Sequence, residues 1–126
     1  MNIPAQTFAL VAAVTHLWIF TMESVRFSRP QVHAMFEVRP ADLDTVRPWA
    51  FHQGCYNALL ALQMLAGLIA VHLGASTAGH ALVLAAGASM LAAGVALIAF
   101  DPRRARIKGL IGQGAPALAT LIALVA

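Results

Sequence analysis

The sequence predicts an all-α fold: a membrane-embedded four-helix bundle that forms a single domain. The 126 residues are 60% hydrophobic and only 10% charged, whereas an average soluble domain is about 25% charged. Four apolar stretches follow one another, each long enough to cross most or all of the hydrocarbon core as a helix. A chain of this length fits one domain. We therefore expect a multi-pass protein of the cell inner (plasma) membrane.

The four predicted spans are separated by connections of unequal length. They cover residues 3–23, 49–73, 80–100 and 109–126. The first span has a proline near its start, where a missing N–H costs little. The connection 24–48 is unusually long and holds three prolines, which is typical of a lid or binding element. We expect a short amphipathic helix within it, lying on the membrane surface.

Basic residues mark one side of the predicted bundle. All eight Lys and Arg residues lie in the first and third connections, which share a side in a chain with four spans. Cytoplasmic loops carry the excess of Lys and Arg, so the sequence predicts a cytoplasmic side there and both termini on the non-cytoplasmic side. These basic residues flank apolar runs, so we expect contacts with membrane lipids and no nucleic acid partner.

Polar side chains gather in the half of the spans next to the basic connections. The second span opens with His52-Gln53-Gly54-Cys55-Tyr56-Asn57, and such groups are costly in hydrocarbon unless they are paired or bound. His16 and Glu23 are seven residues apart, on one face of the first span, with His16 roughly 10 Å deeper. Gln113 lies about one turn into the fourth span. We predict that these side chains face one shared site.

The residue types indicate acid–base or ligand chemistry at this site. A histidine titrates near neutral pH, and a carboxylic acid in low dielectric can keep its proton. The predicted roles are catalytic for His16, Glu23 and Tyr56, cofactor-binding for His52 and Asn57, and ligand-binding for Gln53 and Gln113. The alternative is that the amides and hydroxyls tie helices together, with Glu23 reaching the surface. The single cysteine predicts neither a disulfide nor a metal site.

A proline in the fourth span predicts a further polar group at the same depth. Pro116 leaves the carbonyl of Gly112 without its helical donor. A free carbonyl in the membrane needs a partner, and we expect Tyr56 or Asn57 to donate to it.

The third span carries a ridge of small residues, and three further histidines lie outside the predicted site. In the third span, Ala81, Ala85, Ser89 and Ala93 recur every four residues. Such a ridge favours close packing, either within the bundle or between protomers of a homo-oligomer. We expect His33, His72 and His80 to be solvated loop residues.

Several of these residues form a pattern found in a known family. His16 is followed seven residues later by Glu23, Gln53-Gly54 by Tyr56-Asn57, and Gln113-Gly114 by Pro116-Ala117. With the Pro- and Phe-bearing connection 30–36, nearly the whole chain resembles the small bacterial and fungal membrane proteins grouped as domain of unknown function 1304 (DUF1304). It departs at His52, where Asn is expected, and at Ser24, where Met is usual. The resemblance implies a four-helix membrane protein and no settled activity.

A looser resemblance is to the membrane-bound epoxide isomerases typified by styrene oxide isomerase. These are also small four-helix proteins with a His near the start of a span and an Asn soon after, as in His52 and Asn57, although the spacing differs. This resemblance implies a ferric haem b acting as a Lewis acid on an epoxide, with a His as axial ligand. It is a fold-level analogy.

Three functions are compatible with the sequence. The first is a membrane enzyme, such as an isomerase, that binds a small lipophilic molecule and uses acid–base or Lewis-acid chemistry. The second is an oligomeric small-solute transporter or channel, although the half of the spans near the termini has few polar groups and no inverted repeat is visible. The third is a structural or lipid-binding accessory subunit.

Overall fold

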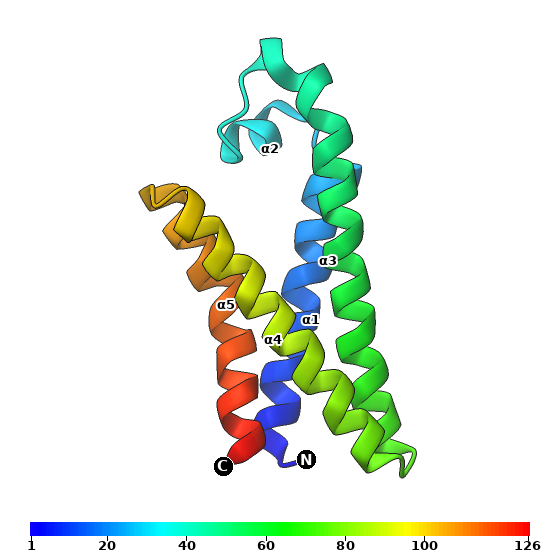
Figure 1. The fold of residues 1–126 in the computed structure, drawn as a ribbon. Coiled ribbons are helices and arrows are strands. Elements are labelled where there is room, and N and C mark those ends of the chain that lie inside the picture. The colour runs from blue at the N-terminus through cyan, green and yellow to red at the C-terminus, as the bar shows by residue number, and fades with distance from the viewer.

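The computed structural model is an all-α bundle of four long helices with a short fifth helix beside one end (Figure 1). It describes residues 1–104 and 106–126 in full, and only the backbone of residue 105. The helices are α1 (Ile3–Phe20), α2 (Pro30–Met35), α3 (Leu43–His72), α4 (Ser76–Phe100) and α5 (Arg104–Val125). A π-helical turn, η1 (Thr21–Val25), continues α1, and a 3-10 turn, η2 (Pro40–Asp42), precedes α3. The predicted helical class is confirmed.

Four helical segments are long and apolar enough to cross a membrane: Ile3–Val25, Pro40–His72, Ser76–Phe100 and Arg106–Val125. They support the predicted multi-pass membrane protein. The second begins earlier than the predicted start at residue 49, because Pro48 lies inside α3 and does not end it. A proline this close to the start of a helix removes a single intrahelical hydrogen bond.

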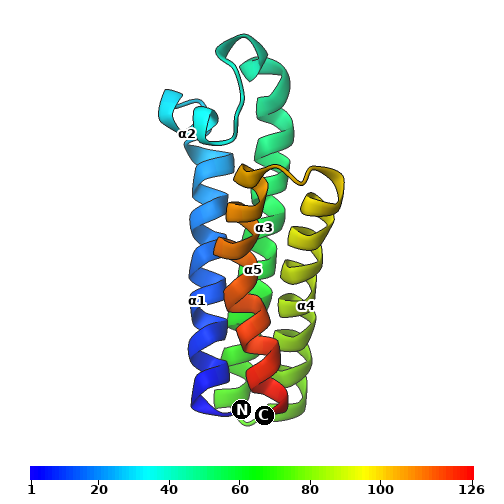
Figure 2. The same cartoon turned by 90° about the vertical axis from the view of Figure 1, so that its left-hand side faces the viewer.

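Both chain termini lie at one end of the bundle, and α2 and the α4–α5 turn lie at the other (Figures 1 and 2). We call the latter the basic end, because the connections that carry all eight Lys and Arg residues lie there. At the opposite end Asn2 accepts from the backbone N–H of Ala5 at 2.8 Å and donates from Nδ2 to the carbonyl of Ala123 at 2.6 Å. This side chain caps α1 and ties it to α5.

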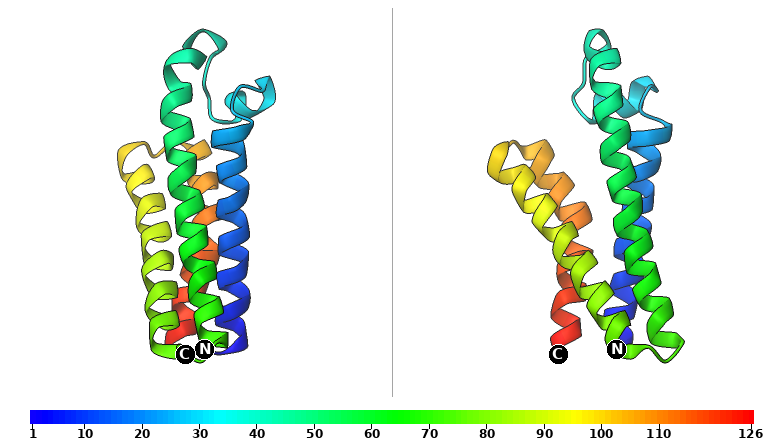
Figure 3. Two further views of the ribbon diagram at one scale, coloured as in Figure 1. Left: turned by 90° about the vertical axis from the view of Figure 1, so that its right-hand side faces the viewer. Right: turned by 45° about the vertical axis from the view of Figure 1, so that its right-hand side comes forward.

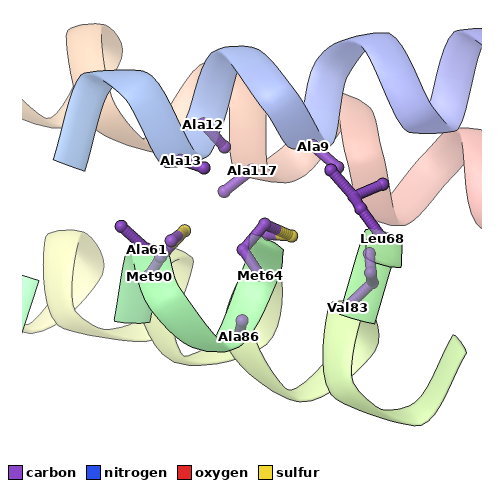
Figure 4. Packing of buried hydrophobic residues seen from close by; sticks show 10 residues of the cluster. All are labelled: Ala9, Ala12, Ala13, Ala61, Met64, Leu68, Val83, Ala86, Met90 and Ala117. Atoms are coloured by element: carbon purple, nitrogen blue, oxygen red, sulfur yellow. The ribbon is translucent and has the colours of Figure 1, made fainter. Parts of the chain in front are cut away.

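The buried core lies away from the basic end and is built largely from small side chains (Figure 4). It contains Ala9, Ala12, Ala13, Ala61, Met64, Leu68, Val83, Ala86, Met90 and Ala117, drawn from all four long helices. α3 and α4 approach each other closely at Gly67 and Gly79, where a Cβ on Gly67 would lie 2.9 Å from the carbonyl oxygen of Gly79. Small residues allow backbones to touch in this way.

Towards the basic end the bundle opens. There α4 and α5 lean away from α1 and α3, as the right-hand view of Figure 3 shows. The predicted ridge on α4 does not close this gap. Ala81, Ala85 and Ser89 are exposed, and Ala93 borders the opening. The ridge therefore does not pack within this chain, and a homo-oligomer that uses it stays a prediction.

The connection around α2 is folded more tightly than the sequence indicated. His33 is only 5% exposed, and its Nδ1 lies 2.9 Å from the carbonyl of Val38. The expectation that His33 is solvated was wrong, because the chain turns back over α2 and packs Phe36 against Phe27, with ring centroids 5.7 Å apart. His72 is exposed, as expected, whereas His80 is half-buried and contacts the Ser76 carbonyl.

Candidate functional site

A cavity of about 1120 Å³ fills the space between the diverging helices at the basic end. All four long helices, η1 and the α2 segment contribute to its walls. Most of the wall is apolar, with Trp18, Ile19, Met22, Leu60 and Leu97 prominent. Its polar members include His16, Glu23, Gln53, Tyr56, Asn57 and Gln113. The structure thus brings six of the seven sequence-predicted site residues to one cavity, whereas His52 is not among the described residues that line it.

His16 lies on α1 at the inner wall of the cavity and is only 1% exposed. Its Nδ1 is 2.9 Å from the carbonyl oxygen of Ala12. A carbonyl can only accept, so Nδ1 carries the proton in this bond. In the neutral ring Nε2 then keeps its lone pair. His16 can therefore accept a proton or bind a metal through Nε2.

Glu23 lies in η1, the π-helical turn that ends α1. The turn is closed by a bond from the N–H of Arg26 to the carbonyl of Thr21 at 2.9 Å. A π turn inserts an extra residue and rotates the chain beyond it, and such turns are frequent at functional sites. Here Glu23 Oε2 accepts a 2.8 Å hydrogen bond from Asn57 Nδ2 on α3.

Gly54 lets α3 lie directly against η1. A Cβ at this position would overlap Ser24 Oγ and lie 3.0 Å from the Cβ of Glu23. The hydroxyl of Ser24 donates to the carbonyl of Phe51 at 2.9 Å, which adds a second tie between the elements. The small hydroxyl fits the position where the family resemblance led us to expect Met. The close approach fixes the backbone that carries Glu23.

His52 and Asn57, both predicted to bind a cofactor, lie on different faces of α3. Residues five apart on a helix point about 140° away from each other, and only Asn57 is turned towards the cavity. His52 is exposed and packs edge-on against Tyr56, with ring centroids 4.8 Å apart. Tyr56 itself is 53% exposed and borders the cavity.

The fit of a haem can be judged from the same side chains. An axial histidine must offer a ring nitrogen lone pair to the iron within the haem pocket. His16 meets this requirement through Nε2, because its Nδ1 is occupied by Ala12 and its ring borders the cavity. His52, the ligand expected from the sequence, lies outside the lining and does not.

The carbonyl of Gly112 is not satisfied in the way that the sequence predicted. Asn57 Nδ2 donates to Glu23 and to the carbonyl of Gln53, the latter at 3.2 Å. Neither Asn57 nor Tyr56 donates to Gly112 in the described part of the chain. Gly112 borders the cavity, and its helical donor is absent at Pro116.

Ion pairs hold the α2 segment across the mouth of the cavity. Met35 and Phe36 border the cavity, and the next residue, Glu37, has a positive φ of 60°. Its Oε2 lies 3.1 Å from Arg103 and 3.5 Å from Arg106 at the start of α5. This contact joins the first long connection to the α4–α5 turn. The sequence contains no local signal for it.

Asp101 sits on the other side of these arginines. Arg103 Nε donates to Asp101 Oδ1 at 2.7 Å, and Arg106 Nε to Oδ2 at 3.3 Å. Hydrogen bonds from Arg103 are the main reason that the pKa of Asp101 lies well below its usual range, and Arg106 adds to the effect. The two carboxylates together position both guanidinium groups.

Comparison with known proteins identifies a family. The family model described as "Protein of unknown function (DUF1304)" matches residues 10–125. The match includes every side chain of the candidate site and almost all of the four long helices. None of the curated proteins and none of the solved structures compared with the chain matches it. The chain therefore belongs to the DUF1304 family, whose function is unknown.

Proposed function

We propose that this membrane protein binds a small lipophilic molecule in the cavity at the basic end and isomerises it by acid–base chemistry. One observation carries the proposal: a buried histidine and a carboxyl group border the same, mostly apolar cavity. Its volume of about 1120 Å³ is slightly larger than the roughly 300–1,000 Å³ typical of small-molecule sites. By the basic residues, this side of the membrane is predicted to be cytoplasmic.

His16 and Glu23 suit the two halves of a proton transfer. The Nε2 lone pair of His16 can take a proton from a substrate carbon, with Nδ1–H held by Ala12. Asn57 binds one oxygen of Glu23, which leaves Oε1 to donate or accept at the substrate. A proton removed at one carbon and returned at another changes the isomer and needs no co-reactant. Tyr56 and Gln113 can hold a substrate oxygen from the cavity wall.

The resemblance to epoxide isomerases gives a Lewis-acid version of the same reaction. When bound, a haem b would supply the Lewis acid for an epoxide oxygen. In this version His16 would hold the iron in place of His52, and Tyr56 and Gln113 would orient the substrate. The absorption spectrum of purified protein distinguishes the versions, because a His-ligated haem has a Soret band that is lost in His16→Ala.

The transporter hypothesis has less support. A second, smaller cavity of about 260 Å³ lies near the terminal end, lined by Ile3, Gln6, Thr7, Leu10, Leu68 and His72. The core around Ala12, Met64 and Met90 is fully packed between the two cavities. A solute would have to cross that apolar layer. A flux in proteoliposomes that is lost in His16→Ala would reverse this ranking.

The test is turnover of a panel of lipophilic epoxides and β,γ-unsaturated ketones by protein reconstituted in nanodiscs, followed by gas chromatography. We expect one class to be isomerised, with the rate reduced at least about 100-fold in His16→Ala and in Glu23→Gln, the scale of a lost general acid or base. His72→Ala is the control, since this histidine is exposed at the far end. Turnover that survives both cavity substitutions contradicts the acid–base proposal.

A further inference from the structure

Two basic side chains border the cavity, and both lie near the start of α5. Arg106 and Lys108 are the cations among the described lining residues, and Glu23 is the carboxyl group. Among the described residues Glu23 forms no ion pair with either cation, and its Oε2 accepts a hydrogen bond from Asn57. The cavity thus has a cationic rim at the basic end and an apolar body beyond it.

The two cations differ in their ion pairs. Arg106 contacts Asp101 at 3.3 Å and Glu37 at 3.5 Å, and its side chain is 23% exposed. Lys108 is exposed and forms no ion pair with any described residue. Carboxylates outside the lining therefore fix the position of Arg106, while the ammonium group of Lys108 is available at the rim. A lysine at such a boundary keeps its stem on apolar surface and its charge towards water.

Along the helix axes, the two cations lie nearer the basic end than His16 and Gln113, which have predicted catalytic and ligand-binding roles. Gln113 lies five residues beyond Lys108 on α5, roughly 7.5 Å deeper. His16 on α1 lies deeper than Glu23 in η1, and no hydrogen bond joins its Nε2 to any described residue. A molecule that reaches His16 while it fills the mouth must contact cations at one end and apolar side chains such as Leu60 and Leu97 along its length.

We infer that the ligand of this cavity is an anionic amphiphile, with a carboxylate or phosphate at Lys108 and Arg106 and a hydrocarbon body directed towards His16. The inference rests on the proposed function and names the chemical class of its ligand. A phospholipid of the surrounding bilayer and a free single-chain acid or phosphate ester share this chemistry. Charge-assisted hydrogen bonds to an anionic oxygen are about twice as strong as neutral ones, so the head group contributes specificity that an apolar wall lacks.

The native tryptophans provide a reporter. Trp18 borders the cavity, whereas Trp49 is 74% exposed and lies outside its lining. A Trp49→Phe background therefore leaves one fluorophore at the site. In nanodiscs of zwitterionic phosphatidylcholine, this protein is titrated with dodecyl phosphate, with dodecanol, which has the same chain without the charge, and with dodecyltrimethylammonium.

We expect dodecyl phosphate to bind about tenfold or more tightly than dodecanol, a ratio that corresponds to one charge-assisted hydrogen bond. Lys108→Gln should remove this preference and leave dodecanol binding unchanged, and Lys108→Arg should keep it. Arg104→Gln is the matched control, since Arg104 is exposed about one turn before Lys108 on α5 and does not line the cavity. The control should retain the preference.

The outcomes separate the inference from the proposed function. Equal affinity for dodecyl phosphate and dodecanol overturns the inference and leaves a lipophilic site. A preference that falls equally in Arg104→Gln also overturns it, because general attraction to a basic surface then explains the result. No fluorescence change with any probe contradicts the proposed function itself. With the preference established, phosphatidylglycerol in the nanodisc should compete through Lys108 if the natural ligand is a bilayer lipid, and should not compete if it is a free molecule.

Discussion

Asn57 donates from Nδ2 to Glu23 Oε2 at 2.8 Å, and this bond joins the π-helical end of α1 to the last residue of the polar segment 52–57 of α3. The same amide also donates to the carbonyl of Gln53 in its own helix. Both amide hydrogens are used, so the orientation of the side chain is fixed. The bond therefore holds the Glu23 carboxyl group in one position at the cavity wall.

Removing this amide should weaken the bundle and displace the carboxyl group. For Asn57→Leu we expect a loss of about 1–3 kcal/mol in the free energy of unfolding, the cost of leaving a buried polar partner unsatisfied. Thermal unfolding in detergent measures it. In a double-mutant cycle with Glu23→Gln, the coupling should be about 0.5–3 kcal/mol. Additive losses would show that the bond contributes nothing to stability.

A single methyl group at position 54 should separate α3 from η1. In Gly54→Ala the new Cβ meets Ser24 Oγ and the Cβ of Glu23, so the backbones must move apart, at a cost of about 1–3 kcal/mol. Turnover or ligand affinity should fall together with stability.

Gly109→Ala is the matched control for that substitution. This helical glycine also borders the cavity, but a Cβ there meets nothing within 4 Å. Alanine should stabilise α5 by up to about 1 kcal/mol through helix propensity. Equal destabilisation by both substitutions would contradict the close contact between Gly54 and Ser24.

Breaking the Glu37 contacts should speed the exchange of a bound molecule. Glu37→Gln removes the ion pairs with Arg103 and Arg106, and we expect a faster dissociation rate with little change in melting temperature, because exposed pairs contribute only about 0–1 kcal/mol. Stopped-flow fluorescence of Trp18 measures the rate. Asp42→Asn is the control, since it breaks an exposed pair with Arg39 away from the cavity. Equal rates in Glu37→Gln and wild type would exclude a lid role.

Acid should loosen the same end of the bundle through Asp101. The folded state lowers the pKa of this carboxyl group below its ordinary 3.8, so its stabilising effect is complete above that value and is lost as the pH falls further. We expect dissociation to accelerate below about pH 4 in wild type. Asp101→Asn should show the fast rate already at neutral pH and respond less to acid. An unchanged pH profile in this variant would contradict the assignment.

The sequence was sufficient for the class of the fold and for the meeting of the polar groups. The lengths of the apolar stretches predicted the four long helices. The positions of His16, Tyr56 and Gln113 along their helices predicted that all three lie in the half of the bundle next to the basic end. The π turn at Glu23 was not predicted from the sequence, and neither was its contact with Gly54, which lies on a separate helix. The position of His52 outside the cavity lining follows from its offset of five residues from Asn57, which puts the two on different faces of the helix.

The close approach of α3 and α4 at Gly67 and Gly79 lies outside the cavity lining. From Gly79 to Leu97, α4 runs 18 residues, or about 27 Å. With α3 and α4 in contact at Gly67 and Gly79, a rotation of α4 and α5 by about 10° around that contact would move Leu97 by about 5 Å. In such a motion the two glycines would be the pivot, and the cavity end of α4 would move the furthest. Changes in packing at the terminal end would therefore be transmitted, amplified, to the width of the cavity.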